Sequence, residues 1–275
     1  MEQNREVCRA CRRDFVAEGR TFLCESCWGG VPKTKREPRP RFFSDQPHGE
    51  DREQDLNFPS TFGFYDLERH MVDPSIYEGV PAIVYPYFRN IKRALLNHID
   101  AADYVVGCIA WYTDPDIIRA LNEKERASVV LQKETFLSSC KDGSWNNELR
   151  ELYAEGGEDL SDLSIGPLVT AAEDGFVFPG RFRCFGLNRK GTAPRMHHKF
   201  VVFGNVDGSS EQIDFHSVWA GSFNFTKNAS LSLEDAELVE GRGVAQSFLL
   251  RWSQVLCMSE PLDWTSDDFS PEWTG

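Results

Sequence analysis

The sequence has no apolar run that approaches the ~20 residues needed to cross a bilayer. Its first residues, Met-Glu-Gln-Asn-Arg, carry no signal-peptide pattern. It also lacks a basic amphipathic helix, the usual feature of proteins that lie on a membrane surface. We therefore expect a cytoplasmic protein that does not act at a membrane.

Positive charge is scarce as well. The chain has 30 Lys and Arg against 43 Asp and Glu, a net charge of −13. Residues 1–41 have a net charge of +4, and the remainder carries −17. A phosphate-bearing ligand would therefore need either a local basic site on an acidic body or the basic N-terminal arm. The alternative is that the acidity only keeps the protein in solution.

Eight cysteines are present, and four of them form two closely spaced pairs. The pairs Cys8-x-x-Cys11 and Cys24-x-x-Cys27 are separated by twelve residues. Such pairs supply four thiolates to one tetrahedral Zn²⁺ ion, which predicts a structural zinc ribbon over residues 1–30. Four thiolates leave no open position, so we expect no catalytic role for this zinc. The alternatives are four unrelated reduced cysteines or two disulfides, and cytoplasmic chains rarely hold disulfides.

The other four cysteines are scattered and are expected to be small buried hydrophobic residues: Cys108, Cys140, Cys184 and Cys257.

Residues 31–57 are rich in proline and charge, which predicts a linker. We interpret its basic cluster, Lys33 to Arg41, either as a contact to nucleic acid or as a solvated stretch without a partner. The main domain is expected over residues 58–260. Residues 261–275 form an acidic tail to which the sequence assigns no role.

Within the main domain, stretches with helical spacing of apolar residues alternate with short β-branched or aromatic runs. Helices are expected over residues 85–102, 115–121, 145–153 and 243–258. Strands are expected over residues 104–112, 127–131, 181–187, 199–203, 217–220 and 234–239. This alternation predicts an α/β fold with a sheet flanked by helices.

The strongest chemical signal lies around the strand expected over residues 199–203. Side chains alternate along a strand, so His197 and Lys199 share a face, whereas His198 points the other way. An imidazole and an ammonium group therefore lie side by side at the start of this strand.

A hairpin brings two more polar groups to the same place. An Asp207-Gly208 turn connects the strand to the next one, which ends in Gly221-Ser222. The hydroxyl of Ser222 and the amide of Asn224 then converge with the imidazole and the ammonium group. This set suits attack on a phosphate, with histidine as nucleophile and Lys and Asn stabilising the charge that develops on the phosphoryl oxygens.

His197-x-Lys199 followed by Gly221-Ser222-x-Asn224 resembles the signature of the phospholipase D superfamily, which is His-x-Lys-x4-Asp followed by Gly-Ser-x-x-Asn. The resemblance covers residues 58–258. It implies a phospholipase D-like mixed sheet flanked by helices, to which this chain adds the small N-terminal zinc ribbon. It also implies hydrolysis through a covalent phosphohistidine without a catalytic metal.

The family has two acidic positions, and this chain has a residue of a different kind at one of them. Gly204 stands where the motif has its Asp, which we treat as a structural support in the family. Glu237 lies where the family carries a Glu behind the nucleophilic His, and a carboxylate there would fix the imidazole tautomer and orientation. The alternative for Glu237 is an ordinary surface acid.

The chain contains a single His-x-Lys motif. Single-motif members of the superfamily work as homodimers, so the resemblance implies a site to which each of two copies contributes one His and one Lys. It implies a nuclease or phosphodiesterase that acts on DNA or RNA, of a kind often found in bacterial restriction and defence systems. Two alternatives stay open: a catalytically silent nucleic-acid-binding or scaffold protein, and a lipid phosphodiesterase.

Overall fold

The computed structural model divides the chain into two compact units, Met1–Arg52 and Glu53–Gly275. The structure describes residues 5–7, 14–16, 81–124, 126–133, 144–155, 163, 165–186, 196–206, 212–262 and 272–273. In the first unit, β1 (Arg5–Val7) and β2 (Asp14–Val16) pair in antiparallel fashion. The four cysteines predicted to bind zinc and the predicted linker lie outside the described residues, so the zinc ribbon stays a prediction.

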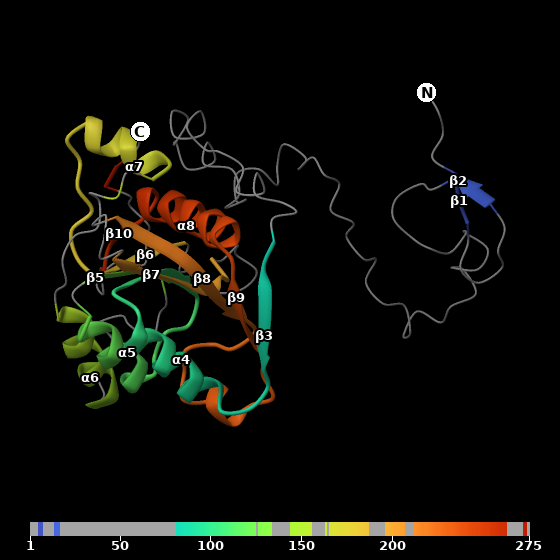
Figure 1. Ribbon diagram of the computed structural model, residues 1–275, viewed down its shortest axis with the longest axis horizontal. Helices are drawn as coiled ribbons and strands as arrows, with labels where there is room; N and C mark the ends of the chain where they lie inside the picture. Colours follow the sequence, from blue (N-terminus) through green and yellow to red (C-terminus); the bar gives the residue numbers. More distant parts are fainter. Residues whose placement is uncertain are drawn as a thin grey trace. The chain divides into compact units, whose positions relative to one another are not determined.

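The second unit is built on one eight-stranded sheet in the order β10-β6-β5-β4-β7-β8-β9-β3 (Figure 1). The strands are β3 (Ile83–Tyr87), β4 (Tyr104–Ile109), β5 (Arg126–Gln132), β6 (Phe182–Phe185), β7 (Lys199–Val206), β8 (Ile213–Gly221), β9 (Ala236–Glu240) and β10 (Glu260–Pro261). Strands β4, β5 and β6 are parallel, whereas all pairs from β4 through β7, β8 and β9 to β3 are antiparallel. The sheet is therefore mixed.

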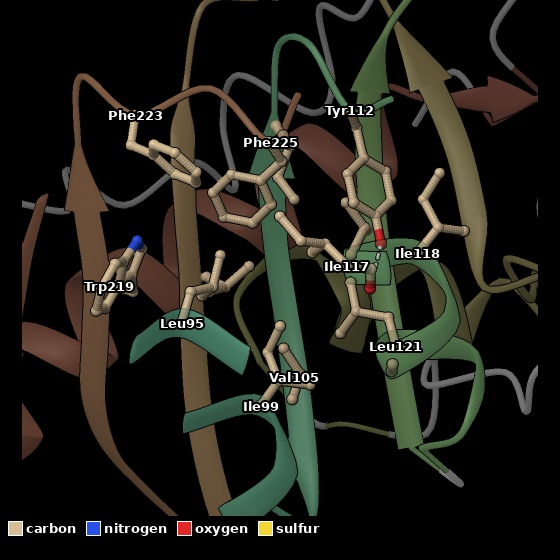
Figure 2. Packing of buried hydrophobic residues seen from close by; sticks show 14 of the residues in the cluster. Leu95, Ile99, Val105, Tyr112, Ile117, Ile118, Leu121, Trp219, Phe223 and Phe225 are labelled. Atoms are coloured by element: carbon tan, nitrogen blue, oxygen red, sulfur yellow. Dashed lines mark hydrogen bonds between the residues drawn. The ribbon is translucent and has the colours of Figure 1, made fainter. Parts of the chain in front are cut away.

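Helices cover both faces of this sheet (Figure 1). Helices α4 (Ile91–Ala101), α5 (Pro115–Asn122) and α6 (Ser144–Ala154) lie on one face, and α7 (Pro167–Glu173) and α8 (Arg242–Cys257) lie on the other. Each face has its own apolar cluster. Figure 2 shows part of the first, in which Leu95 of α4 lies beside Trp219 and Ile99 of α4 lies beside Val105. The predicted α/β fold with a mixed sheet flanked by helices is confirmed.

The prediction for residues 85–102 was wrong in its first part. Ile91, Leu95 and Ile99 are buried on α4 as their helical spacing predicts. The preceding residues form β3, which pairs with β9 as the edge strand of the sheet. Asn90, with a left-handed φ of 55°, separates the strand from the helix. Pairing with a distant strand thus overrides the local helical pattern.

The predicted start of α5 is confirmed by its cap. Asp114 precedes Pro115, and its side chain accepts a hydrogen bond from the backbone N–H of Asp116 at 3.0 Å. Proline at the first helical position lacks only an N–H group that the helix would leave unpaired. The capping carboxylate also binds Lys92 of α4 at 2.8 Å, which ties the two helix starts together.

The acidic tail, to which the sequence assigns no role, contributes to packing. Trp273 is buried against Phe178 and donates from Nε1 to Asp174 at 3.2 Å. Glu272 binds the buried Arg183 of β6 at 2.6 Å. Trp273 is therefore part of the apolar cluster on the α8 face.

Three of the scattered cysteines, Cys108, Cys184 and Cys257, are buried as predicted, and Cys140 lies outside the described residues. In the part of the chain that the structure describes, no helix has the length and apolar character needed to span a membrane.

Candidate active site

Five strand ends lie side by side along one edge of the sheet, the edge that runs across the strands and not along one of them. Strands β3, β4 and β8 end there, and β7 and β9 begin there, because neighbours in this part of the sheet are antiparallel. Lys199 stands opposite Ile109, and Ala236 stands opposite both Gly221 and Tyr87. The segments that carry the predicted site residues therefore leave the sheet side by side.

His197 and Lys199 lie together at this edge, as strand alternation predicts. The Lys199 Nζ is 3.2 Å from both ring nitrogens of His197 and donates to its backbone carbonyl at 3.1 Å. The exposed imidazole packs edge-on against Trp111, with 4.9 Å between ring centroids. The ammonium group also lies 5.5 Å from the centre of the indole ring. Trp111 was not among the predicted site residues, although it lies only two residues after the end of β4.

Two opposing effects act on the pKa of Lys199, and burial is the larger. Burial lowers the pKa of this ammonium group, and the carboxylate of Glu234 raises it in part. Groups with shifted pKa values occur more often at functional sites than elsewhere in proteins.

Ser222 belongs to the turn from β8 into the site loop, and backbone contacts fix it. Its N–H and that of Phe223 both donate to the carbonyl of Asp235, at 3.0 and 3.2 Å. Its Oγ donates to Glu234 at 2.5 Å and accepts from the N–H of Asp235 at 3.1 Å. Gly221 permits this close approach, because a Cβ there would stand 2.5 Å from the Asp235 carbonyl oxygen.

Asn224 lies in the same loop, next to Phe225, whose backbone anchors the loop to the segment between β4 and α5. The carbonyl of Phe225 accepts from the N–H groups of Thr113 and Asp114 at 2.8 and 2.9 Å. The Oδ1 atom of Asn224 is buried and has no hydrogen-bond partner among the described residues. Buried polar atoms are nearly always paired, so this unpaired oxygen is an exception in the loop that carries Ser222.

His198 points to the opposite face, as predicted. It accepts a hydrogen bond from Nε of Arg251 on α8 at 3.3 Å and packs against Phe200. Burial and the neighbouring charges of Arg251 and Lys199 lower its pKa to about 4. His198 is therefore neutral near pH 7 and supports the strand from behind.

The sheet register does not bring Glu237 to His197. Glu237 stands opposite Ala220, which stands opposite Phe200, so all three side chains are on the α8 face. Lys199 directly precedes Phe200 in β7, so its side chain faces the other side of the sheet. The acid that contacts the site is Glu234, which sequence reasoning missed. The β8–β9 register, extended by one residue, pairs Ser222 with Asp235. Glu234 is the neighbour of Asp235, so this register would have indicated it.

Gly204 has a packing reason to lack a side chain. A β-bulge lies between Phe203 and Gly204, and a Cβ at Gly204 would stand 2.8 Å from the ring of Phe215. A carboxylate is nevertheless present nearby, because Asp103 accepts a hydrogen bond from the N–H of Val206 at 2.9 Å. The end of β7 is thus held by an acid that comes from the start of β4. Asp207 lies outside the described residues.

Within the described residues, no three His, Cys, Asp or Glu side chains form a group that could hold a metal ion.

Comparisons with known proteins give one relative in sequence and several in structure. No family model matches the chain. The uncharacterized protein L381 of Acanthamoeba polyphaga mimivirus is 28% identical over 230 residues, covering 76% of this chain and 79% of that protein. Nuc from Salmonella typhimurium, a phospholipase D family member, matches in structure at 19% identity and a TM-score of 0.41, covering 68% of this chain and 100% of that one. NucT from Helicobacter pylori matches at 15% identity and a TM-score of 0.42, covering 66% and 100%.

The structure thus has a match within the phospholipase D superfamily, whose motif the sequence resembles.

Proposed function

We propose that this chain is a phosphodiesterase that cleaves nucleic acid through a covalent phosphohistidine, at a site shared by two copies of the chain. One observation carries the proposal: the exposed imidazole of His197 is held by Lys199 and Trp111 at the sheet edge where the Ser222–Asn224 loop arrives. An oriented nucleophile beside a cation is what attack on a phosphodiester requires.

The chemistry proceeds in two displacements. A ring nitrogen of His197 attacks phosphorus and forms an N–P bond, while the P–O bond to the leaving nucleotide breaks. The leaving oxygen takes a proton from the second copy's His197. That imidazole then removes a proton from water, whose oxygen attacks phosphorus and breaks the N–P bond. Lys199 stabilises negative charge on the phosphoryl oxygens in both steps.

The absence of the motif Asp is compatible with this role. Phe215 fills the space beside Gly204, and Asp103 supplies a carboxylate to the end of β7. The strand that carries Lys199 is therefore supported without the motif residue.

The direct test is cleavage of labelled single-stranded DNA, double-stranded DNA, RNA and phosphatidylcholine in buffer without divalent cations. We expect wild-type protein to cut a nucleic acid, and His197→Ala to lose activity with a nearly unchanged melting temperature. A requirement for added Mg²⁺, or activity that survives His197→Ala, would exclude the mechanism. Failure to cut any substrate would favour the scaffold alternative, and cleavage of the lipid alone would favour the lipid phosphodiesterase.

We also propose that Cys8, Cys11, Cys24 and Cys27 hold one structural Zn²⁺ ion, on the basis of their spacing. Elemental analysis of the purified protein is expected to give one zinc per chain, and Cys24→Ser should lose it. A wild-type protein that contains no zinc would refute this.

A further inference from the structure

A basic groove lies at the same sheet edge as His197. It has a volume of about 410 Å³ and is lined on one side by the start of α4 and the residues before it, including Phe88, Arg89 and Arg93. Its other wall includes Phe223 and Ser230, which belong to the loop that carries Ser222 and Asn224. The groove and the candidate active site therefore share one loop.

The sheet register gives the direction from site to groove. Strand β3 lies three strands from β7 and ends at the same edge, directly before Phe88. Neighbouring strands are about 4.8 Å apart, so the groove begins roughly 14 Å from Lys199 along the edge. A few nucleotides of an extended strand cover such a distance.

The groove concentrates positive charge on an acidic chain. Arg89 and Arg93 are exposed, and no ion pair joins either of them to another residue in the described part of the chain. Lys92 differs from them: burial disfavours its charged form, but hydrogen bonds with Asp114 and Asp116 raise its pKa overall. Lys92 is thus held between two carboxylates, whereas the two arginines remain available for phosphates.

Phe88 adds an aromatic surface. Its side chain is 69% exposed beside the two arginines. An exposed ring next to arginines is the arrangement on which proteins stack the bases of single-stranded nucleic acid, while the cations bind its phosphates. In a duplex the bases are already stacked and the charge density is doubled, with one charge per ~1.7 Å. A chain of net charge −13 would repel that density more strongly.

We propose that a single strand of nucleic acid runs from His197 along this edge into the groove, where Arg89 and Arg93 bind its phosphates and Phe88 stacks on a base. This inference rests on the proposed function, because it assigns the substrate of the same site. It names a binding surface that the His-x-Lys motif does not contain.

The test measures binding separately from cleavage. The full zinc-loaded chain carrying His197→Ala is titrated against a fluorescein-labelled oligo-dT strand of twelve nucleotides, with fluorescence anisotropy as the readout. Adding Arg89→Ala and Arg93→Ala should weaken binding at low salt at least tenfold. It should also reduce the slope of log K against log salt by about 1.4, since each lost single-strand phosphate contact contributes ~0.7. Phe88→Ala should weaken binding about tenfold, and Phe88→Trp should restore it.

Matched variants serve as controls. Lys124→Ala with Arg126→Ala removes the same charge at the opposite edge of the sheet, and Ile83→Ala removes an exposed apolar side chain from the far end of β3. Both should leave the affinity unchanged. If they weaken binding as much as the groove variants do, or if the groove variants bind normally, the proposal is wrong.

Two further results would overturn it. One is a duplex of the same length that binds as tightly as the single strand. The other is groove-dependent binding to phosphatidylglycerol vesicles with no binding to the oligonucleotide.

The two proposals can fail separately. If the strand binds through the groove but wild-type protein cuts nothing, the proposed function is wrong and the groove is still a binding site. If wild-type protein cleaves and the groove variants bind and cleave normally, only the groove fails.

Discussion

At the scale of single residues, the charge on Lys199 sets a limit on activity at high pH. Burial lowers the pKa of its ammonium group, so Lys199 loses its proton at a lower pH than a solvated lysine with a pKa near 10.4. The neutral amine stabilises the phosphoryl oxygens less well. We therefore expect kcat/KM to fall in the alkaline range, below the ordinary lysine pKa.

Arginine stays charged throughout that range. Lys199→Arg should therefore remove the alkaline fall even if its activity is lower at all pH values, and Lys199→Met should lose roughly 100-fold or more in kcat. A pH–rate profile of Lys199→Arg that keeps the same alkaline fall would assign it to another group.

A second residue-scale prediction separates two neighbouring acids. Glu234 accepts a hydrogen bond from Ser222, whereas Glu237 lies on the other face of the sheet. Glu234→Gln should lower kcat about tenfold, since it weakens a charge-assisted hydrogen bond worth ~1.5–3 kcal/mol. Glu237→Gln is the matched control, and its kcat should equal that of the wild type. The opposite order of effects would restore Glu237 as the residue that supports His197.

At the scale of elements, packing in β7 leaves no room for a side chain at the position of the motif Asp. Gly204→Asp would restore the family residue but push its Cβ into Phe215. We expect a loss of about 1–3 kcal/mol in the free energy of unfolding, as for other overpacked sites, and no gain in activity. Denaturant unfolding measures the loss.

The double variant Gly204→Asp, Phe215→Ala should lose less free energy of unfolding than the two single variants lose together. The reason is that the clash is absent once the ring is removed. Additive losses, or a Gly204→Asp variant that is as stable as the wild type and more active, would contradict the packing explanation.

The elements also show how far the sequence could predict the fold and the site. The run from Phe200 to Phe203 predicted β7, and alternation placed His197, His198 and Lys199 on their observed faces, because both signals are local. The strand β3 was missed because its partner strand β9 is distant from it in the sequence. Glu234 was missed for the same reason: its place depends on the register of β8 with β9, which no local pattern specifies.

At the scale of the whole molecule, the proposed mechanism takes its acid from the His197 of a second copy, because the chain contains a single His-x-Lys motif. A C2 dimer places two His197 residues around one phosphate, because the same surface patch meets itself. After subunit exchange with excess His197→Ala chains, activity should fall more steeply than the wild-type fraction, since mixed dimers have either the nucleophile or its acid partner but not both. A proportional fall, or an active monomer in sedimentation, would exclude a shared site.

In the proposed mechanism His197 forms a bond to phosphorus, and the most direct measurement is to capture that bond. The protein is mixed with a labelled single-stranded oligonucleotide in buffer without divalent cations, quenched in alkali, where phosphohistidine survives, and digested for mass spectrometry. We predict a nucleotide phosphate attached to His197 in the wild type and none in His197→Ala. Cleavage that proceeds with no adduct on His197, or with the adduct on another residue, would contradict the mechanism.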